Sequence, residues 1–440
     1  MKKVVIIGGG PAGRVTVHTL HAAKEEFDIT LIKDEEINVN RCAVPYGIID
    51  KKPVDKFCIP NSLVTDFGAK LVIDKATKIN TKENFVLTEN GDRYDYDYLL
   101  LATGSKPIIP LIEGVNLGNI TTVRSKQDME RLREFAKRYK KCVIVGGGYI
   151  GVEVAVVLKK LGLDVTIVEM LEHILLATLD DDFAIEVENH LKEKGINVVT
   201  GDKVIAFEGD ESVKKVVLES GEKIDTDFVV ISVGVVPNVE LAEKSKIKVS
   251  KLGIKTDEYL RTNIENIFAA GDCAEKKSFI TKRTIRGEFG TNAVFMGRVV
   301  GANIAGKNVK FPGVINANVS TVFEYSFGSA GLIEKAVKNE GIDVVVGESE
   351  VMDMYPMMDG VSKIKTKLVF ERSTGKLIGG TVLRKGHCVA ANIDFISFAI
   401  QKSATIDEIL LHQYSTHPEL AAKPSDNIYV FAARDALKKI

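Results

Sequence analysis

Apolar runs followed by glycine turns recur through the first half of the chain and predict strands of a parallel sheet. The run from Lys3 to Ile7 leads directly into the turn Gly8–Gly13 and then into a helix-like segment that extends through Leu20 to Ala23. Asp28 to Ile32 reads as the next strand. Strand, glycine turn and helix in this order predict a dinucleotide-binding unit, because glycines permit the tight turn, the approach of backbone N–H groups to a pyrophosphate and close helix packing.

The same pattern returns once. Lys141 to Val145 predicts a strand, Gly146–Gly151 a turn, Val152 to Leu161 a helix, and Val165 to Val168 a second strand that ends at Glu169. Two such units in one chain predict two dinucleotides, one a resident redox cofactor and the other an exchangeable nicotinamide. A carboxylate at the position of Glu169 accepts a bond from a ribose 2′-hydroxyl and repels a 2′-phosphate, so the second site favours NADH over NADPH.

Three more strands are predicted to end in small residues: Tyr98–Gly104, Phe228–Gly234 and Ile267–Asp272. Asp272 follows a glycine, where its carboxylate could meet a polyol hydroxyl. From Ile315 the pattern changes to alternating strands with no further glycine motif, which predicts a separate α+β domain. We therefore predict an α/β fold with two Rossmann-like dinucleotide-binding domains and a C-terminal α+β domain.

Composition narrows the classes of partner. Lys and Arg together number 59 against 60 Asp and Glu, without long single-sign runs, so neither nucleic acid nor a polybasic membrane anchor is indicated. No apolar run approaches the ~18 residues of a membrane span. The apolar run at the start of the sequence ends at Gly8 and is too short for the apolar region of a signal peptide. We expect a cytoplasmic protein with small-molecule partners. Five cysteines without a CxxC pair argue against a disulfide framework and a zinc site.

Cys42 is predicted to be redox-active. It follows Arg41, which favours the thiolate, and precedes Pro45, which suits the first turn of a helix whose positive end would lower the thiol pKa further. The other cysteines are expected to be small buried packing residues; these are Cys58, Cys142, Cys273 and Cys388.

The ordered motifs GxGxxG, single-cysteine loop, ATG, GGGYIGVE and Gly-Asp resemble the FAD-dependent pyridine nucleotide–disulfide oxidoreductases along essentially the whole chain. The similarity is greatest to the single-cysteine branch of NADH oxidases, NADH peroxidases and coenzyme A-disulfide reductases. It implies FAD in the first site and NADH in the second. The implied binding residues are Gly8, Gly10, Pro11, Ala12, Gly13, Asp34, Glu35, Arg41, Cys42, Ala102, Thr103, Gly104, Gly271 and Asp272 for FAD, and Gly146, Gly148, Tyr149, Ile150, Gly151, Glu153, Glu169 and Gly234 for NAD.

The resemblance also implies a division into domains and a homodimer. Residues 1–112 and 239–315 would bind FAD, residues 113–238 would bind NAD, and residues 316–440 would form the dimer interface.

The chain departs from the family pattern at three places. Lys33 stands where an acid usually binds the FAD ribose, so that role passes to Asp34 or Glu35. Gly47 stands where glutathione reductase-like members carry a second cysteine, so an intramolecular disulfide cannot form at this loop. The first glycine motif has Gly10-Pro11 where oxidases and peroxidases typically have a histidine, which weakens a peroxidase assignment.

The mechanism implied by the resemblance carries a hydride from NADH to FAD and then electrons to an oxidised Cys42. The resting cysteine would be a sulfenic acid or a mixed disulfide with a thiol such as coenzyme A. His417 or Tyr414 of the partner subunit would move the proton, and Tyr355 and Tyr414 match tyrosines of coenzyme A-disulfide reductases. Ala422 stands where related enzymes place the acidic partner of the histidine. Glu153 could face the nicotinamide.

Three functions remain open at this stage. The first is an enzyme that reduces a disulfide, persulfide or polysulfide, or oxygen, through Cys42. The second is a flavin reductase that donates electrons to a rubredoxin-like protein without using Cys42. The third is an NADH-sensing flavoprotein that acts through a protein interaction.

Overall fold

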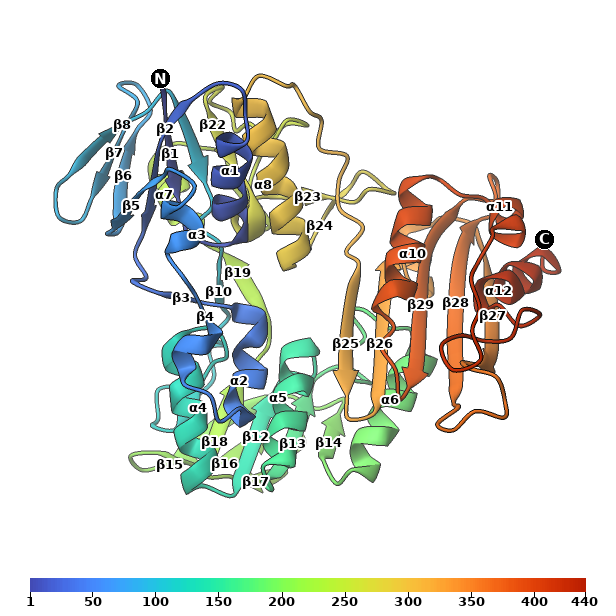
Figure 1. Ribbon diagram of the computed structural model, residues 1–440. Helices are drawn as coiled ribbons and strands as arrows, with labels where there is room; N and C mark the ends of the chain where they lie inside the picture. Colours follow the sequence, from blue (N-terminus) through green and yellow to red (C-terminus); the bar gives the residue numbers. More distant parts are fainter. The chain divides into compact units, whose positions relative to one another are not determined.

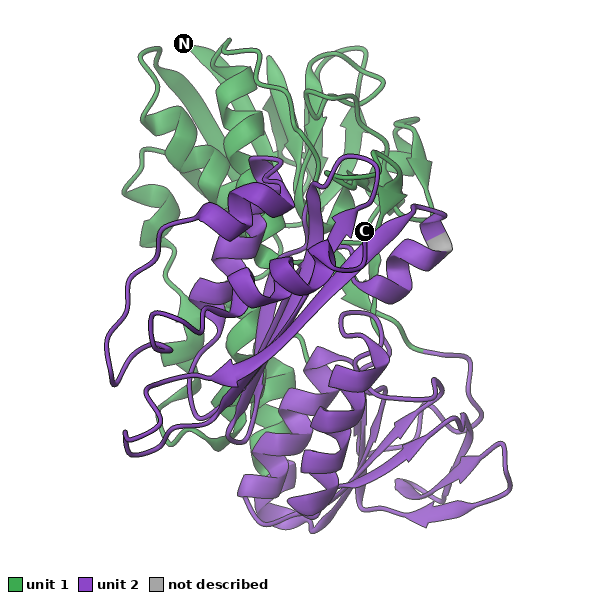
Figure 2. Cartoon of the chain, turned by 90° about the vertical axis from the view of Figure 1, so that its right-hand side faces the viewer, with its two compact units in different colours: residues 1–109, 122–134, 234–314 green, residues 110–121, 135–233, 315–440 purple. Residues whose placement is uncertain are grey.

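The computed structural model describes residues 1–440 apart from the side chain of Asn339 (Figure 1). The chain forms two compact units (Figure 2). Unit 1 comprises residues 1–109, 122–134 and 234–314, and unit 2 comprises residues 110–121, 135–233 and 315–440. Within the described part of the chain, none of the helices combines the length and apolar character that crossing a bilayer requires.

Unit 1 is built on a parallel sheet of strand order β22-β9-β1-β2-β5. Its strands read as continuous apolar runs because helices cover them, and Val4, Ile6 and Leu31 are fully buried. Helices α1 and α8 lie side by side on this sheet (Figure 1). The bounds are β1 Lys2–Ile7, β2 Phe27–Lys33, β5 Lys70–Ile73, β9 Tyr98–Leu101, β22 Ile267–Ala269, α1 Pro11–His21 and α8 Gly290–Ile304.

Smaller elements complete unit 1. An antiparallel sheet of β6, β7 and β8 follows β5, and β10 pairs with β19 in antiparallel register. Their bounds, with those of the helices, are β6 Ala76–Asn80, β7 Phe85–Thr88, β8 Arg93–Asp95, β10 Ser105–Pro107, β19 Val235–Pro237, α2 Val44–Ile49, α3 Ser62–Thr65 and α7 Glu240–Lys244. Helix α4, Lys126–Arg138, begins in unit 1 and ends in unit 2. Three pairs of two-residue strands are β3 Asn38–Val39 with β4 Cys58–Ile59, β20 Val249–Ser250 with β21 Gly253–Ile254, and β23 Lys276–Lys277 with β24 Thr284–Ile285. The short strand β11, Ile120–Thr121, belongs to unit 2.

Unit 2 contains a second parallel sheet, of order β11-β18-β12-β13-β14. Its central strands are again buried on both faces, as for Ile144, Ile167 and Val229. The bounds are β12 Lys141–Val145, β13 Asp164–Glu169, β14 Asn197–Thr200, β18 Phe228–Ile231, α5 Tyr149–Lys160 and α6 Asp181–Glu193; an antiparallel sheet of β15 Val204–Gly209, β16 Val213–Leu218 and β17 Lys223–Asp225 accompanies it.

The C-terminal part of unit 2 is an antiparallel sheet of order β25-β26-β29-β28-β27. Helix α12 approaches β27 closely, since a Cβ on Gly347 would lie 1.9 Å from the carbonyl oxygen of Ala432. The bounds are β25 Asn318–Val322, β26 Tyr325–Gly331, β27 Val344–Met352, β28 Lys363–Glu371, β29 Leu377–Lys385, α9 Glu334–Glu340, α10 Ala390–Gln401, α11 Ile406–Leu411 and α12 Ile428–Leu437.

The predicted fold class is confirmed: two Rossmann-like units and a C-terminal α+β domain. The predicted strand at Lys141 to Val145 has the observed bounds. The helix after each glycine turn starts earlier than expected, at Pro11 and at Tyr149. Both helices therefore begin within the glycine motif, because the last glycine of each motif, Gly13 or Gly151, already lies in the helix. In α1 the first position is also occupied by Pro11, which suits the start of a helix.

Candidate active site

The first glycine turn connects β1 to α1 in unit 1. Gly8 has φ +117°, and a Cβ there would lie 2.0 Å from the carbonyl oxygen of Ala102. A Cβ on Gly13 would lie 2.1 Å from the carbonyl oxygen of Gly8. Gly10, the residue before α1, faces open space instead. Two glycines are thus required by packing, and the third leaves the start of α1 accessible, as a phosphate-binding turn needs.

A partly buried polar cluster surrounds Asp272 in unit 1. Asp272 lies in a short 3-10 helix, Gly271–Cys273, directly after β22. Its Oδ2 accepts a hydrogen bond of 2.7 Å from the Ser105 hydroxyl. Arg124 donates to the Ser105 Oγ at 2.9 Å and its guanidinium lies 3.8 Å from the Asp272 carboxylate. Burial, together with the nearby charge of Arg41, lowers the pKa of Arg124 to about 10.

The turn after β9 is closed by a reciprocal pair. The Thr103 hydroxyl donates to the carbonyl oxygen of Asn238 at 2.7 Å, and the Asn238 side-chain amide donates to the carbonyl oxygen of Thr103 at 2.9 Å. Gly104 has φ +71°, which a side chain would strain. Sequence reasoning found Ala102, Thr103, Gly104 and Asp272 but missed Arg124, Ser105 and Asn238, because no motif marks a residue whose partner is far along the chain.

Cys42 is an exposed thiol in a 3-10 turn, Arg41–Ala43, immediately before α2. Pro45 lies in the first turn of α2, as predicted. The guanidinium of Arg41 is 3.1 Å from Glu35 Oε1, so its charge is shared with a carboxylate. The end of α2 is held by Arg133, which donates to the carbonyl oxygens of Gly47 at 2.7 Å and of Lys52 at 2.8 Å.

The two candidate acids after β2 differ in their contacts. Asp34 is exposed. Glu35 is half-buried and accepts from the Asn38 side-chain amide at 2.5 Å as well as from Arg41. Glu35 is therefore the acid whose position the fold determines, while Lys33 is buried beside it, with 6% exposure.

The second glycine turn, in unit 2, repeats these constraints. Gly146 has φ +105° with a would-be Cβ 2.6 Å from the Ser232 carbonyl oxygen, and the Cβ of a residue at Gly151 would lie 2.0 Å from the Gly146 carbonyl oxygen. Gly148 again faces open space. Glu169 Oε2 accepts the backbone N–H of Gly147 at 2.6 Å, and Oε1 accepts that of Leu171 at 2.9 Å. The predicted ribose acid thus stands at the turn.

Helix α5 carries three more candidate residues. The Tyr149 ring stacks on Phe327, with centroids 6.0 Å apart, and its hydroxyl donates to Asn318 Oδ1. Glu153 Oε1 accepts from the Ser320 hydroxyl at 2.8 Å. Both contacts come from the C-terminal sheet. Ile150 is 40% exposed and points away from the core.

Gly234, the last candidate for the second site, has φ +105°. It begins the final segment of unit 1, and its carbonyl oxygen accepts the N–H of Ile108 at 3.0 Å.

The candidate acid–base residues lie in the C-terminal sheet's loops. The backbone N–H of Tyr355 donates to the carbonyl oxygen of Pro418 at 3.0 Å, which brings Tyr355 beside the segment of His417. The Nδ1 of His417 accepts the N–H of Glu419 at 3.3 Å. The Tyr414 hydroxyl donates to the carbonyl oxygen of Pro424 at 2.6 Å. Tyr414 and His417 are exposed, so each is accessible from outside the chain.

The remaining cysteines are mostly packing residues. Cys142 and Cys273 are buried, as predicted, and burial raises the pKa of both thiols. Cys58 is partly buried, and burial likewise raises the pKa of its thiol. The prediction for Cys388 was wrong: it is exposed. It lies in the turn before α10, where its sulfur accepts the N–H of Ala390 at 3.3 Å.

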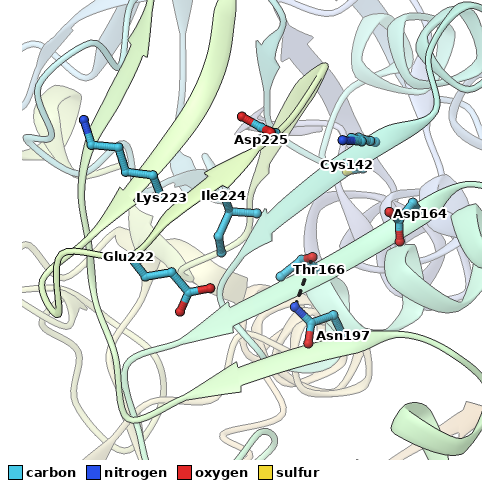
Figure 3. A pocket seen from close by; sticks show the side chains of 9 residues that line it. Cys142, Asp164, Thr166, Asn197, Glu222, Lys223, Ile224 and Asp225 are labelled. Carbon is cyan, nitrogen blue, oxygen red and sulfur yellow. Dashed lines mark hydrogen bonds between the residues drawn. The ribbon is translucent and has the colours of Figure 1, made fainter.

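A cavity of about 280 Å³ in unit 2 is not part of this site (Figure 3). It lies at the amino ends of β12 and β13, next to Lys141 and Asp164, whereas the glycine turn follows the carboxyl end of β12 and Glu169 is the last residue of β13. Parallel sheets bind dinucleotides at their carboxyl ends. Among the described residues, no group of His, Cys, Asp or Glu is arranged to hold a metal ion.

Comparison with known families identifies two matches. A family model described as "Pyridine nucleotide-disulphide oxidoreductase" matches residues 2–297. The dimerisation domain of the same family matches residues 317–427.

Individual proteins are similar over nearly the whole chain. An NADH oxidase of Methanocaldococcus jannaschii is 34% identical, covering 100% of this chain and 99% of its own. An NAD(P)H coenzyme A polysulfide/persulfide reductase of Pyrococcus horikoshii is 32% identical, with 96% and 95% covered. The solved structure of an NAD-dependent persulfide reductase from A. fulgidus superposes with a TM-score of 0.93 at 32% identity, covering 99% of this chain and 83% of that one.

Proposed function

This chain belongs to the pyridine nucleotide-disulphide oxidoreductase family, and from this premise we propose that it oxidises NADH with FAD as cofactor and reduces a small acceptor through Cys42. The acceptor is oxygen or a disulfide or persulfide, such as a coenzyme A species. The observation that carries the proposal is the exposed thiol of Cys42, the one cysteine of the single-cysteine loop between β2 and α2.

The residues of unit 1 fit FAD. Gly10 leaves the start of α1 open to a pyrophosphate, and the Asp272 carboxylate, held by Ser105 and Arg124, is suited to a polyol hydroxyl. In unit 2, Gly148 and Glu169 suit NADH in the same manner. When bound, FAD supplies the acceptance of a hydride from NADH and the electron pair that restores the Cys42 thiolate.

Because the Cys42 thiol is exposed, an external disulfide or persulfide can reach it. The Cys42 thiolate attacks one sulfur of a disulfide or persulfide; a new Cys42–sulfur bond forms, the original sulfur–sulfur bond breaks, and the released thiolate takes a proton. His417 or Tyr414 of the partner subunit supplies that proton in our proposal. A matched exposed thiol, Cys388, lies elsewhere in the chain and takes no part.

The homodimer is part of the proposal. Several large apolar side chains of the helices and loops of the C-terminal domain are exposed, as is usual for a surface that a partner covers; they include Met357 at 72%, Phe398 at 60%, Leu411 at 81% and Leu420 at 73%. The division at residues 112, 238 and 315, the roles of the site residues and the cytoplasmic location stay predictions.

The two alternative functions are less well supported. The relatives described above are named for NADH oxidation and for persulfide reduction, which favours a small acceptor over a rubredoxin-like protein and over an NADH sensor without turnover.

The test replaces Cys42 by serine, with Cys388→Ser as the matched control. NADH consumption is measured with oxygen, coenzyme A disulfide and a persulfide as separate acceptors. We expect Cys42→Ser to lose disulfide and persulfide turnover by at least about a hundredfold while Cys388→Ser keeps it. Unchanged rates of Cys42→Ser with all three acceptors would overturn the proposal. Mass spectrometry of the unreduced protein then shows whether Cys42 carries oxygen or a bound thiol.

A further inference from the structure

Lys33 is a buried cation at a place where a dinucleotide-binding fold normally presents a carboxylate. It is the last residue of β2 and only 6% exposed. The strand pairs in parallel with β1, so its carboxyl end lies beside the glycine turn that follows β1. In such folds this is the edge at which the adenosine ribose is bound.

The ammonium of Lys33 is fully engaged by the protein. It donates to Asn61 Oδ1 at 2.7 Å, to Asn38 Oδ1 at 3.1 Å and to the carbonyl oxygen of Glu36 at 3.1 Å. An ammonium has three N–H donors, and all three are directed to carbonyl-type oxygens. Lys33 therefore acts on the loop after β2 and does not itself present a donor to a ligand.

The bond to Lys33 orients the Asn38 side chain. Because Oδ1 accepts from the ammonium, the amide nitrogen faces the other way and donates to Glu35 Oε2 at 2.5 Å. Asn38 also lies against the glycine turn, since a Cβ on Gly9 would be 2.7 Å from Asn38 Oδ1 and 2.8 Å from Lys33 Cδ. The Asn38 side chain therefore lies between Glu35 and the glycine turn, and it contacts both.

At the second glycine turn, the acid contacts the turn directly. There Glu169 is the last residue of β13, and its carboxylate accepts the N–H of Gly147 without any intermediary. In the first unit the acid comes two residues after the strand end, in a loop that has to be folded back. Lys33 and Asn38 make hydrogen bonds within this loop, to Glu36 and Glu35 respectively.

We propose that Lys33 is a positioning residue for the adenosine ribose of the first dinucleotide: through Asn38 it places the Glu35 carboxylate to accept hydrogen bonds from the ribose hydroxyls. The inference rests on the proposed function, in which FAD occupies the first site. Arg41, beside Cys42, holds the other oxygen of the same carboxylate at 3.1 Å, so both ends of Glu35 are fixed by the protein. A carboxylate held in this way pays little ordering entropy when the ribose binds.

The decisive experiment compares two ligands on two proteins. Apo-protein is titrated with FAD and with an FAD analogue whose adenosine ribose lacks the 2′-hydroxyl, for the wild type and for Lys33→Met. In the wild type the analogue should bind about tenfold or more weakly, because the hydrogen bond to a charged carboxylate is lost. In Lys33→Met that penalty should shrink to less than about threefold, since the carboxylate is no longer placed.

Two further variants keep the test independent of folding. Asn38→Ala removes the link without removing the buried charge and should also abolish the discrimination. Lys70→Met, at an exposed lysine on the neighbouring strand β5, should leave it unchanged. Circular dichroism of each apo-protein reports the fold separately from ligand affinity.

The outcomes separate this inference from the proposed function. If the wild type binds FAD but not more tightly than the analogue, or if Lys33→Met and Asn38→Ala show the full wild-type penalty, the positioning role of Lys33 is wrong and FAD use stands. If the wild type binds neither flavin, the proposed function itself fails.

Discussion

A Cβ atom on Gly47 would lie 2.5 Å from the Sδ of Met129. Met129, in α4, is fully buried against α2, the helix that follows Cys42. Real Cβ atoms do not approach a heavy atom so closely, so any side chain at position 47 would force the buried Met129 side chain to move. Gly47 in α2 is thus matched to the Met129 side chain, which has to repack if a larger residue takes this position.

Replacing Gly47 by alanine should destabilise the protein by about 1–3 kcal/mol despite the better helix propensity of alanine. The cost should fall in the Gly47→Ala/Met129→Ala double variant relative to the sum of the single variants, because the clash is removed. Urea unfolding midpoints measure this. Gly290→Ala, where a Cβ meets open space, is the control; an equal loss there would contradict the packing argument.

Glu169→Gln should weaken NADH binding and reduce the preference of the protein for NADH over NADPH. The carboxylate is held by two backbone N–H groups, from Gly147 and Leu171, and in the proposed NADH site its negative charge would face the ribose. Loss of that charge should raise the KM for NADH by about 10–100-fold with a smaller change in kcat. Steady-state kinetics with both nucleotides check it, with exposed Glu172→Gln as control. An unchanged ratio of the two KM values would refute the assignment.

Arg124→Met should reduce flavin affinity more than it reduces fold stability. Arg124 is a largely desolvated cation, and it contacts the same Ser105 hydroxyl as Asp272. Bound FAD, which is an anion, would further compensate its charge. We expect the dissociation constant for FAD to rise about tenfold or more. Quenching of flavin fluorescence on binding measures it. Arg138→Met, at the other end of α4, serves as comparison. Equal flavin affinity in Arg124→Met and the wild type would show that Arg124 does not face the cofactor.

Tyr96→Phe should raise stability, above all in alkali. Burial raises the pKa of Tyr96 to about 12, above the ~10 of an unfolded tyrosine, so the contribution is present below pH ~10 and lost as the pH rises through about 12. Its hydroxyl is buried without a hydrogen-bond partner among the described residues. Phenylalanine should therefore add about 1 kcal/mol at neutral pH.

The same variant should also remove about 2–3 kcal/mol of stability loss between pH ~10 and ~12. Thermal unfolding across this pH range measures both effects, with Tyr98→Phe on β9 as control. A wild type and Tyr96→Phe that lose stability in parallel above pH 10 would count against the buried phenol as the cause.

The amino-acid sequence determined the elements and their chemistry where both are local. The glycine turns at Gly8 and Gly146 and the strand ending at Glu169 follow from short-range rules: apolar runs form buried strands, and only glycine tolerates the backbone and the close approaches that the turns require. The family resemblance carried by these motifs gave the cofactors and Cys42, and the family matches bear that resemblance out.

Tertiary structure decided everything that depends on residues far apart in the chain. Arg124 reaches Ser105 and Asp272 only after three segments of unit 1 assemble, and Met129 meets Gly47 only when α4 packs on α2. Cys388 is exposed because it lies in the turn before α10, which composition does not reveal. In the sequence, Lys33 shows only that the usual acid is absent from this position. In the fold it is a buried cation that donates to three oxygens, because each donor of a buried ammonium needs a partner.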